Sequence, residues 1–235
     1  PRYYQLRMEP RRGESGETAL LRASVVTHLA LFVEQDNVRG LAERKGLAFL
    51  GFPRRGEVRR SAVDPTLVET VLTVAIQEGG APVFDYALER FYESDDALLR
   101  GQLLRALASV KGETLANRAR ALSLDSRLRS NEMTTPLFVQ MSMQETRDAT
   151  WRYARTNIAR LMERLGNRSG FMPWLAASFC SEDEAAEVEA FFTPYLDRMP
   201  GGPRNLRSAT EAIRLCAAGA AAQAPSAQRF FAQQP

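Results

Sequence analysis

Signals for short helices recur along this chain, while signals for strands are almost absent. Asp64 and Pro65 form an N-cap followed by proline at the first helical position, which is a favourable helix start. Apolar side chains then recur at helical spacing over residues 67–75, and the glycines at 79–80 end the pattern. This combination of cap, apolar stripe and stop predicts a helix, and it is repeated several times in the sequence.

Further helices are expected along the rest of the chain. Each is recognised by its start or stop signal. They are a helix opened by Pro82, one capped by Ser94 or Asp95, one after Gly112, a long one over about residues 145–164, one with a capping box of Ser181 and Glu184, and a last long one that follows Gly201 and is broken by Pro225. Short amphipathic helices cannot each bury an apolar stripe alone, and stacked antiparallel hairpins solve that problem. The sequence therefore predicts an all-α fold, a HEAT/armadillo-like α-solenoid. We expect a single domain over residues 1–235, with residues 1–16 as a partly frayed helix end and loop.

Composition narrows the class of protein further. The 235 residues are 45% apolar and 25% charged, which is ordinary for a globular domain, and no stretch approaches the roughly 18 apolar residues of a membrane span. Of the 31 basic residues only Lys45 and Lys111 are lysines, a bias typical of a GC-rich, bacterial genome. With a net charge of +3 the chain is no polycation. Association with a membrane is not expected.

Histidine and cysteine usage restricts the possible chemistry. His28 is the single histidine of the sequence, so a zinc site with two or three imidazoles cannot be built from it. It lies in an apolar stripe, residues 25–29, which favours a core or boundary histidine over a catalytic one. Cys180 and Cys216 are too far apart for a CxxC motif. They either pair as a disulfide, if the last two long helices are antiparallel neighbours, or stay as two buried thiols.

Two charged stretches admit both a structural and a functional interpretation. Asp95 and Asp96 are adjacent at an expected helix start, where they would point apart, so capping is favoured over an acid/base pair. The densest basic run, residues 54–60, is interpreted as a solvated loop between helices, although it could also bind phosphate groups. No HExxH motif and no glycine-rich phosphate loop is present.

A third charged stretch surrounds two aromatic residues. Arg147, Arg152 and Arg155 flank Trp151 and Tyr153. Such a combination can bind an anionic ligand by aromatic stacking and by paired guanidinium hydrogen bonds. A helix whose tryptophan faces the core while its arginines extend into solvent produces the same string, and this interpretation is favoured. From residue chemistry alone, the chain is a helical stack with no visible active site.

An ordered set of segments nevertheless resembles a known family. The segments are Pro10-Arg11-Arg12-Gly13-Glu14, Ala19-Leu20-Leu21-Arg22, Val63-Asp64-Pro65-Thr66-Leu67-Val68, Arg147-Asp148-Ala149-Thr150-Trp151, Phe179-Cys180-Ser181, Glu187-Val188-Glu189-Ala190-Phe191-Phe192, Gly201-Gly202-Pro203-Arg204-Asn205-Leu206 and Glu211-Ala212-Ile213. In this order and spacing, from about residue 3 to the end, they resemble the C-terminal helical domain of the gluzincin zinc aminopeptidases, the puromycin-sensitive and endoplasmic-reticulum type.

This resemblance implies a part of a larger enzyme. In the family, zinc and the catalytic glutamate belong to a thermolysin-like domain upstream, and the helical domain closes over it to form a chamber for peptides. None of the zinc ligands, the catalytic glutamate or the motif that reads the substrate's free amine has a counterpart in these 235 residues. The chain begins at Pro1, and we expect it to be a piece of a longer protein whose compartment the sequence leaves open.

The expected function is accordingly a non-catalytic C-terminal cap of a zinc metallo-aminopeptidase, with the upstream catalytic domain and a peptide substrate as its partners. No cofactor is expected in the chain itself. Arg147, Arg152 and Arg204 are candidates to line the chamber and meet the carboxylate of a peptide. The alternative is a free-standing α-solenoid that binds peptides or nucleic-acid phosphates, although nucleic acid is not expected as a partner. An enzyme that works through His28 is the least favoured class.

Overall fold

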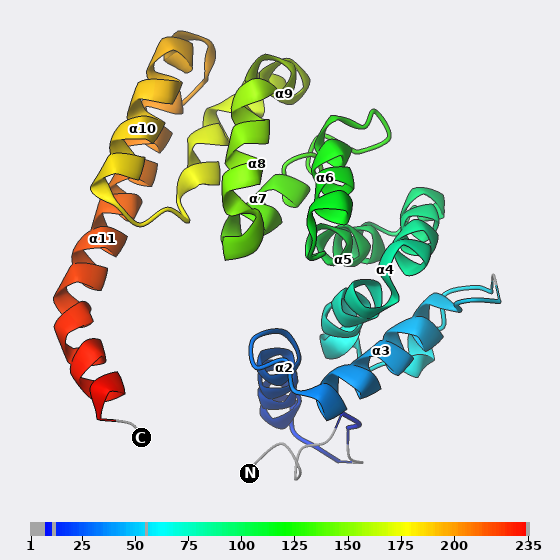
Figure 1. Ribbon diagram of the computed structural model, residues 1–235. Helices are drawn as coiled ribbons and strands as arrows, with labels where there is room; N and C mark the ends of the chain where they lie inside the picture. Colours follow the sequence, from blue (N-terminus) through cyan, green and yellow to red (C-terminus); the bar gives the residue numbers. More distant parts are fainter. Residues whose placement is uncertain (1–7, 11–12, 55, 234–235) are drawn as a thin grey trace. The chain divides into compact units, whose positions relative to one another are not determined.

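The computed structural model describes residues 8–10, 13–54 and 56–233 (Figure 1). Over this part the chain forms α-helices and 3-10 helices without any strand. The all-α class predicted from the sequence is therefore confirmed. Packing divides the chain into two compact units, Pro1–Val139 and Gln140–Pro235. The single-domain organisation and the solenoid arrangement stay predictions.

The first unit is built around one central helix. Its α-helices are α2 (Gly16–Leu31), α3 (Asp36–Leu50), α4 (Val68–Glu93), α5 (Ala97–Ala108) and α6 (Glu113–Ala121), with short 3-10 helices at η1 (Arg60–Ala62), η2 (Pro65–Leu67) and η3 (Leu122–Leu124). Helix α4 packs between α3 and α5 (Figure 1). Val71, Leu72 and Ile76 of α4 are fully buried, so this helix forms the core of the unit.

Helix α7 (Thr135–Ser142) spans the boundary between the units. The second unit then comprises α8 (Gln144–Thr156), α9 (Ile158–Leu165), η4 (Gly166–Ala176), α10 (Glu182–Phe192), η5 (Thr193–Arg198) and α11 (Gly202–Ala232). Helix α11 packs against both η4 and α10, and α8 packs against α9. Figure 1 shows α10 and the first half of α11 side by side. Val188, Phe192, Leu206 and Ile213 are among the buried residues at these contacts.

Several helix boundaries differ from those expected. The long helix predicted over residues 145–164 is two helices, because Asn157 adopts φ −105° and ψ 10° between α8 and α9. Pro225 does not break the last helix, since α11 continues to Ala232. Proline removes one backbone donor, but the alanines on either side have the highest helix propensity and carry the helix through. The cap of α5 is Asp96 rather than Ser94 or Asp95.

The expected interruption at Gly79 and Gly80 is present as a bend inside α4. Gly80 has φ 58° and ψ −148°, a conformation that L residues with a side chain rarely adopt, and the helix resumes beyond it. At the other end of the sequence, most of the frayed helix end expected in residues 1–16 lies outside the described residues. Ser15 caps α2 by accepting a hydrogen bond from the backbone N–H of Thr18 at 3.3 Å.

No single described helix is long and apolar enough to span a membrane; by length and composition alone, α2 and α3 pass that test as a pair bent by 108°.

Candidate functional site

Two of the three arginines predicted to line a substrate chamber lie on α8. Arg147 and Arg152 are five residues apart, which separates them by about 140° around a helix. The half-buried Arg147 donates from Nε to the backbone oxygen of Met141 at 3.0 Å. Its guanidinium therefore braces the turn between α7 and α8, whereas Arg152 is exposed. The helix does not bring the two side chains to a common face.

The third arginine, Arg204, lies at the start of a helix that side-chain contacts hold in place. Arg204 is exposed in the first turn of α11, directly before Asn205. The Asn205 side chain accepts from Trp174 Nε1 at 3.1 Å and donates to the backbone oxygen of Gly170 at 2.8 Å. Gly201 provides the left-handed residue that turns the chain into the helix, with φ 73°. These contacts fasten α11 to η4 and present Arg204 to solvent on a rigid support.

The aromatic group around Trp151 forms a core. Trp151 is 4% exposed, and its ring meets those of Phe179 and Phe191 edge-on at 5.6 and 5.4 Å. Its Nε1 donates to Glu187 Oε1 at 2.9 Å, and Arg155 forms an ion pair with the same carboxylate. The interpretation in which the tryptophan faces the core is confirmed. Arg155 thus has Glu187 as its partner.

Cys180 and Cys216 are joined by a disulfide, with their Cα atoms 5.0 Å apart. Cys180 lies just before α10 and Cys216 lies within α11, so the bond ties these neighbouring helices together. The capping box expected beside it is also present. Ser181 Oγ accepts from the backbone N–H of Glu184 at 3.2 Å, and Glu184 Oε2 accepts from the N–H of Cys180 at 2.9 Å.

His28 is not a core or boundary residue, and that prediction is wrong. The buried positions of α2 are Arg22, Val26 and Ala30, which recur every four residues and define the inner face. His28 falls on the outer face, where its side chain is exposed and its ring stacks on Phe32 at 5.6 Å. The contact that the structure shows for its ring is this stacking on Phe32, which gives no support to catalysis through His28.

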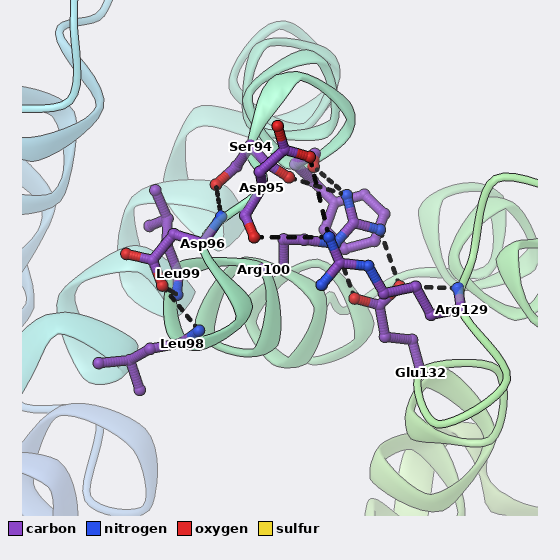
Figure 2. Close-up of polar contacts among 9 residues, drawn as sticks. Ser94, Asp95, Asp96, Leu98, Leu99, Arg100, Arg129 and Glu132 are labelled. Carbon is purple, nitrogen blue, oxygen red and sulfur yellow. Dashed lines mark hydrogen bonds and ion pairs between the residues drawn. The ribbon is translucent and has the colours of Figure 1, made fainter.

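The adjacent acids at the start of α5 have a structural role (Figure 2). Asp96 Oδ1 accepts from the backbone N–H groups of Leu98 at 2.8 Å and Leu99 at 3.2 Å. Its carboxylate also pairs with Arg60, and this contact, with the two N–H groups, holds the pKa of Asp96 below its ordinary value. Capping is confirmed here. The exposed side chain of Asp95 lies apart, at 3.9 Å from Arg129.

Behind this cap lies a buried ion pair that the sequence did not reveal. The Arg100 guanidinium binds both carboxylate oxygens of Glu132 at 2.7 Å, and it also donates to the backbone oxygens of Phe91 and Ser94 (Figure 2). Burial alone would raise the pKa of Glu132, but the bonds from Arg100 and from the Arg129 N–H outweigh it and lower the pKa. The partners are 32 residues apart in sequence, so no local signal identifies the pair.

Arg54, Arg59 and Arg60 of the basic run at residues 54–60 are exposed, in agreement with the expected solvated loop; Gly56 and Val58 are partly buried, and Arg55 lies outside the described residues. Among the described residues no group of three histidine, cysteine, aspartate or glutamate side chains is placed to hold a metal ion. Both cysteines are in the disulfide. The described residues therefore do not fit the zinc site of an aminopeptidase.

The described residues form a helical domain in which α11 is fastened to η4 through Asn205. The model of the ERAP1-like C-terminal domain family matches residues 1–215. The chain belongs to that family, and it is thus a C-terminal domain of the kind found in ERAP1- and PSA-type aminopeptidases. A comparison with curated proteins found no match.

Proposed function

We propose that this chain is the non-catalytic cap of a zinc-dependent aminopeptidase that removes N-terminal residues from peptides. In this proposal the helices stack as a HEAT-like solenoid and close a substrate chamber over a catalytic domain upstream in the same polypeptide. That catalytic domain holds the zinc. The cap contributes shape and charge, and it takes no part in the chemistry of peptide hydrolysis.

The family match over residues 1–215 is the observation that carries this proposal. The sequence contains one histidine, His28, so it does not by itself supply the imidazole ligands of an aminopeptidase zinc site. Long packed helices also offer the large rigid surface that a chamber wall needs.

Within the cap, Arg204 is the residue best suited to meet the carboxylate of a peptide. It is exposed, its helix start is held through Asn205 and Trp174, and a guanidinium forks a carboxylate with two hydrogen bonds. Arg152 is exposed as well, in the middle of α8 rather than at a helix start. Arg147 is the weakest of the three candidates, because its Nε is bound to Met141.

The test is a charge reversal in the enzyme that contains this domain. Arg204→Glu should raise KM for long peptides by about tenfold, which corresponds to the loss of one charge-assisted hydrogen bond. It should leave the turnover of a single-residue anilide unchanged, since that substrate is too short to reach the cap. Arg229→Glu is the matched control, being the same change near the other end of α11.

An equal loss of activity on long peptides and on the anilide would contradict the role of Arg204. The competing function, a free-standing module for nucleic-acid phosphates, makes a different prediction. It requires binding of duplex DNA that weakens steeply between about 50 and 200 mM salt. Binding of that kind, without association with any peptidase domain, would overturn the cap proposal.

A further inference from the structure

The disulfide of Cys180 and Cys216 lies where α11 leaves the packed part of the second unit. Ile213, about one turn before Cys216, is the last buried residue of α11. From Cys216 to Gln233 every residue is exposed or partly exposed. Figure 1 shows this second half of α11 continuing past α10. Among the described residues, the disulfide is therefore the last covalent or polar link between α11 and the rest of its unit.

The disulfide is open to solvent on its α11 side. Cys216 is exposed, whereas Cys180 is half-buried. Residues three and four positions from Cys216 are its neighbours on the helix surface, and they include Ala212, Gly219 and Ala220. Such short side chains leave the Cys216 sulfur uncovered. A small thiol in solution can therefore reach this sulfur while the unit is folded.

The other links at this end of the contact between α10 and α11 are weak. Arg214 forms ion pairs with Glu182 at 3.2 Å and with Glu189 at 3.1 Å. The three side chains are 42% to 69% exposed, and ion pairs this exposed contribute little to stability and are screened by salt. The apolar part of the contact lies further in, at the buried Val188 and Ile213. The disulfide is therefore the main link at the outer end.

The loop that the disulfide closes lies within the second unit. Cys180 and Cys216 are 36 residues apart, and the residues between them form α10, η5 and the first half of α11. The first unit, Pro1–Val139, contains no cysteine. Any effect of reduction is therefore expected in the second unit, and the first unit serves as an internal reference.

We propose that this disulfide is a redox switch, which a dithiol opens while the second unit stays folded, and whose opening frees residues 214–232 of α11 from α10. The thiolate of the dithiol attacks Cys216 Sγ, the S–S bond breaks, and the Cys180 sulfur leaves as a thiolate that takes up a proton. The second thiol of the reductant then attacks the mixed disulfide, and Cys216 also becomes a thiol. The reductant ends as a cyclic disulfide, having passed two electrons and two protons to the protein. The proposal is independent of the cap function.

The first experiment measures how fast dithiothreitol reduces the 235-residue chain when folded and when unfolded in urea, by alkylation of the thiols and mass spectrometry. Apart from its reacting thiolate, dithiothreitol carries no charge for the acidic first turn of α10 to repel. The two rates should agree within about tenfold, because the Cys216 sulfur is exposed in the folded chain. If reduction required global unfolding, the folded chain would react about a thousandfold more slowly or less. A difference of more than about tenfold would overturn the switch and leave a protected structural bond.

The second experiment measures where reduction loosens the fold, by hydrogen exchange of the oxidised and the reduced chain. Backbone amides of residues 214–232 should exchange about tenfold faster after reduction, because their last strong link to α10 is gone. Residues 202–213 and the first unit should keep their exchange rates. Unchanged exchange over 214–232 would overturn the release of this segment. Faster exchange throughout the second unit would show that the bond is needed for folding, which contradicts a switch in a folded unit.

Substitutions separate the disulfide from the ion pairs beside it. The double variant Cys180→Ser with Cys216→Ser should show the exchange pattern of the reduced chain and should not respond to dithiothreitol. Arg214→Gln is the control, since it removes both ion pairs and keeps the disulfide. Its oxidised form should exchange over 214–232 like the oxidised original chain. If Arg214→Gln frees the segment as fully as reduction does, the ion pairs hold α11 to α10 and the disulfide is not the switch.

Discussion

The buried ion pair of Arg100 and Glu132 makes the stability of the first unit depend on a single carboxylate. Their side chains are 5% and 8% exposed. Glu132→Ala would leave the guanidinium buried without its counter-charge and would also remove the acceptor for the N–H of Arg129. We expect the free energy of unfolding of the first unit to fall by about 3 to 5 kcal/mol, measured by urea denaturation.

Glu69→Ala is the matched control, since Glu69 pairs with Arg105 of the same helix α5. There the two side chains are 45% and 41% exposed, and such a pair contributes about 0 to 1 kcal/mol. A difference between the two variants of less than about 1 kcal/mol would show that burial does not strengthen the dependence of Arg100 on its partner.

The environment of Tyr92 should be visible in the pKa of its phenol. Burial and the 2.7 Å hydrogen bond that it donates to Asp125 raise the pKa of Tyr92 to about 12. Arg127 donates to the same carboxylate and holds the pKa of Asp125 well below its ordinary value. Because the pKa of Tyr92 is raised on folding, the stability that it contributes is complete below about pH 10 and is lost as the pH rises towards 12.

Ultraviolet absorbance of the phenolate, taken as the difference between the original chain and Tyr92→Phe, isolates this titration. Asp125→Asn should bring the midpoint down towards the ordinary tyrosine pKa of about 10, since the charged acceptor is removed. A midpoint near 10 in the unsubstituted folded chain would contradict the hydrogen bond.

Local residue signals were predictable, and long-range partners were not. The cap at Asp64 and the box of Ser181 and Glu184 depend on neighbours within three residues, so the sequence displays them. Arg100 and Glu132 are brought together only by tertiary packing. His28 was misjudged for a related reason, because the apolar string around it does not reveal which face of α2 is covered.

At the scale of elements, the close approach of α3 to α4 depends on one glycine. A Cβ at Gly46 would lie 2.2 Å from the backbone oxygen of Val71 and 2.6 Å from the Cβ of Ala75. Gly46→Ala should therefore destabilise the protein by about 1 to 3 kcal/mol through overpacking, although alanine is the better helix former. Thermal and urea unfolding measure the change.

Gly40→Ala supplies the comparison on the same helix. The nearest neighbour of a Cβ at Gly40 is the Arg44 guanidinium at 3.6 Å, an ordinary contact. Here the gain in helix propensity should dominate, and the stability should rise by about 0.5 to 1 kcal/mol. If both substitutions are stabilising, the spacing between α3 and α4 is not set by Gly46.

The positions of the helices could be predicted better than their ends. Capping residues and apolar periodicity indicated the helices of residues 68–121 and 182–232, because both are local properties, whereas α3 and α7 were not among the expected helices. The break at Asn157 carries no such signal, and the passage of α11 through Pro225 depends on the propensity of a whole alanine-rich stretch. The 3-10 helix η4, which receives the start of α11, was missed because it lacks a 3.6-residue period.

At the scale of the whole molecule, the ordered set of short segments was a better guide than any one of them. Together they indicated the family that the match over residues 1–215 shows. The physical reason is that several segments build packing contacts. The segment with Gly201 and Asn205 fastens α11 to η4, and the segment with Glu187 holds Trp151. The same segments do not indicate which arginines would meet a peptide in the proposed cap, since exposed side chains are not fixed by packing.

The chain as a whole should carry no peptidase chemistry of its own. Hydrolysis by a zinc aminopeptidase needs a metal that polarises the carbonyl and lowers the pKa of its bound water. The described residues provide no three-ligand group, and the exposed His28 has no carboxylate partner among them. We therefore expect the purified 235-residue chain to contain no stoichiometric zinc by elemental analysis and to release no product from aminoacyl anilides. If the chain is joined to an upstream catalytic domain, as the proposed function requires, the hydrolysis observed should depend on peptide length, because in that proposal the cap closes the chamber. Zinc that stays bound to the chain through purification, together with anilide hydrolysis that a chelator abolishes, would show that this helical domain is itself a catalyst.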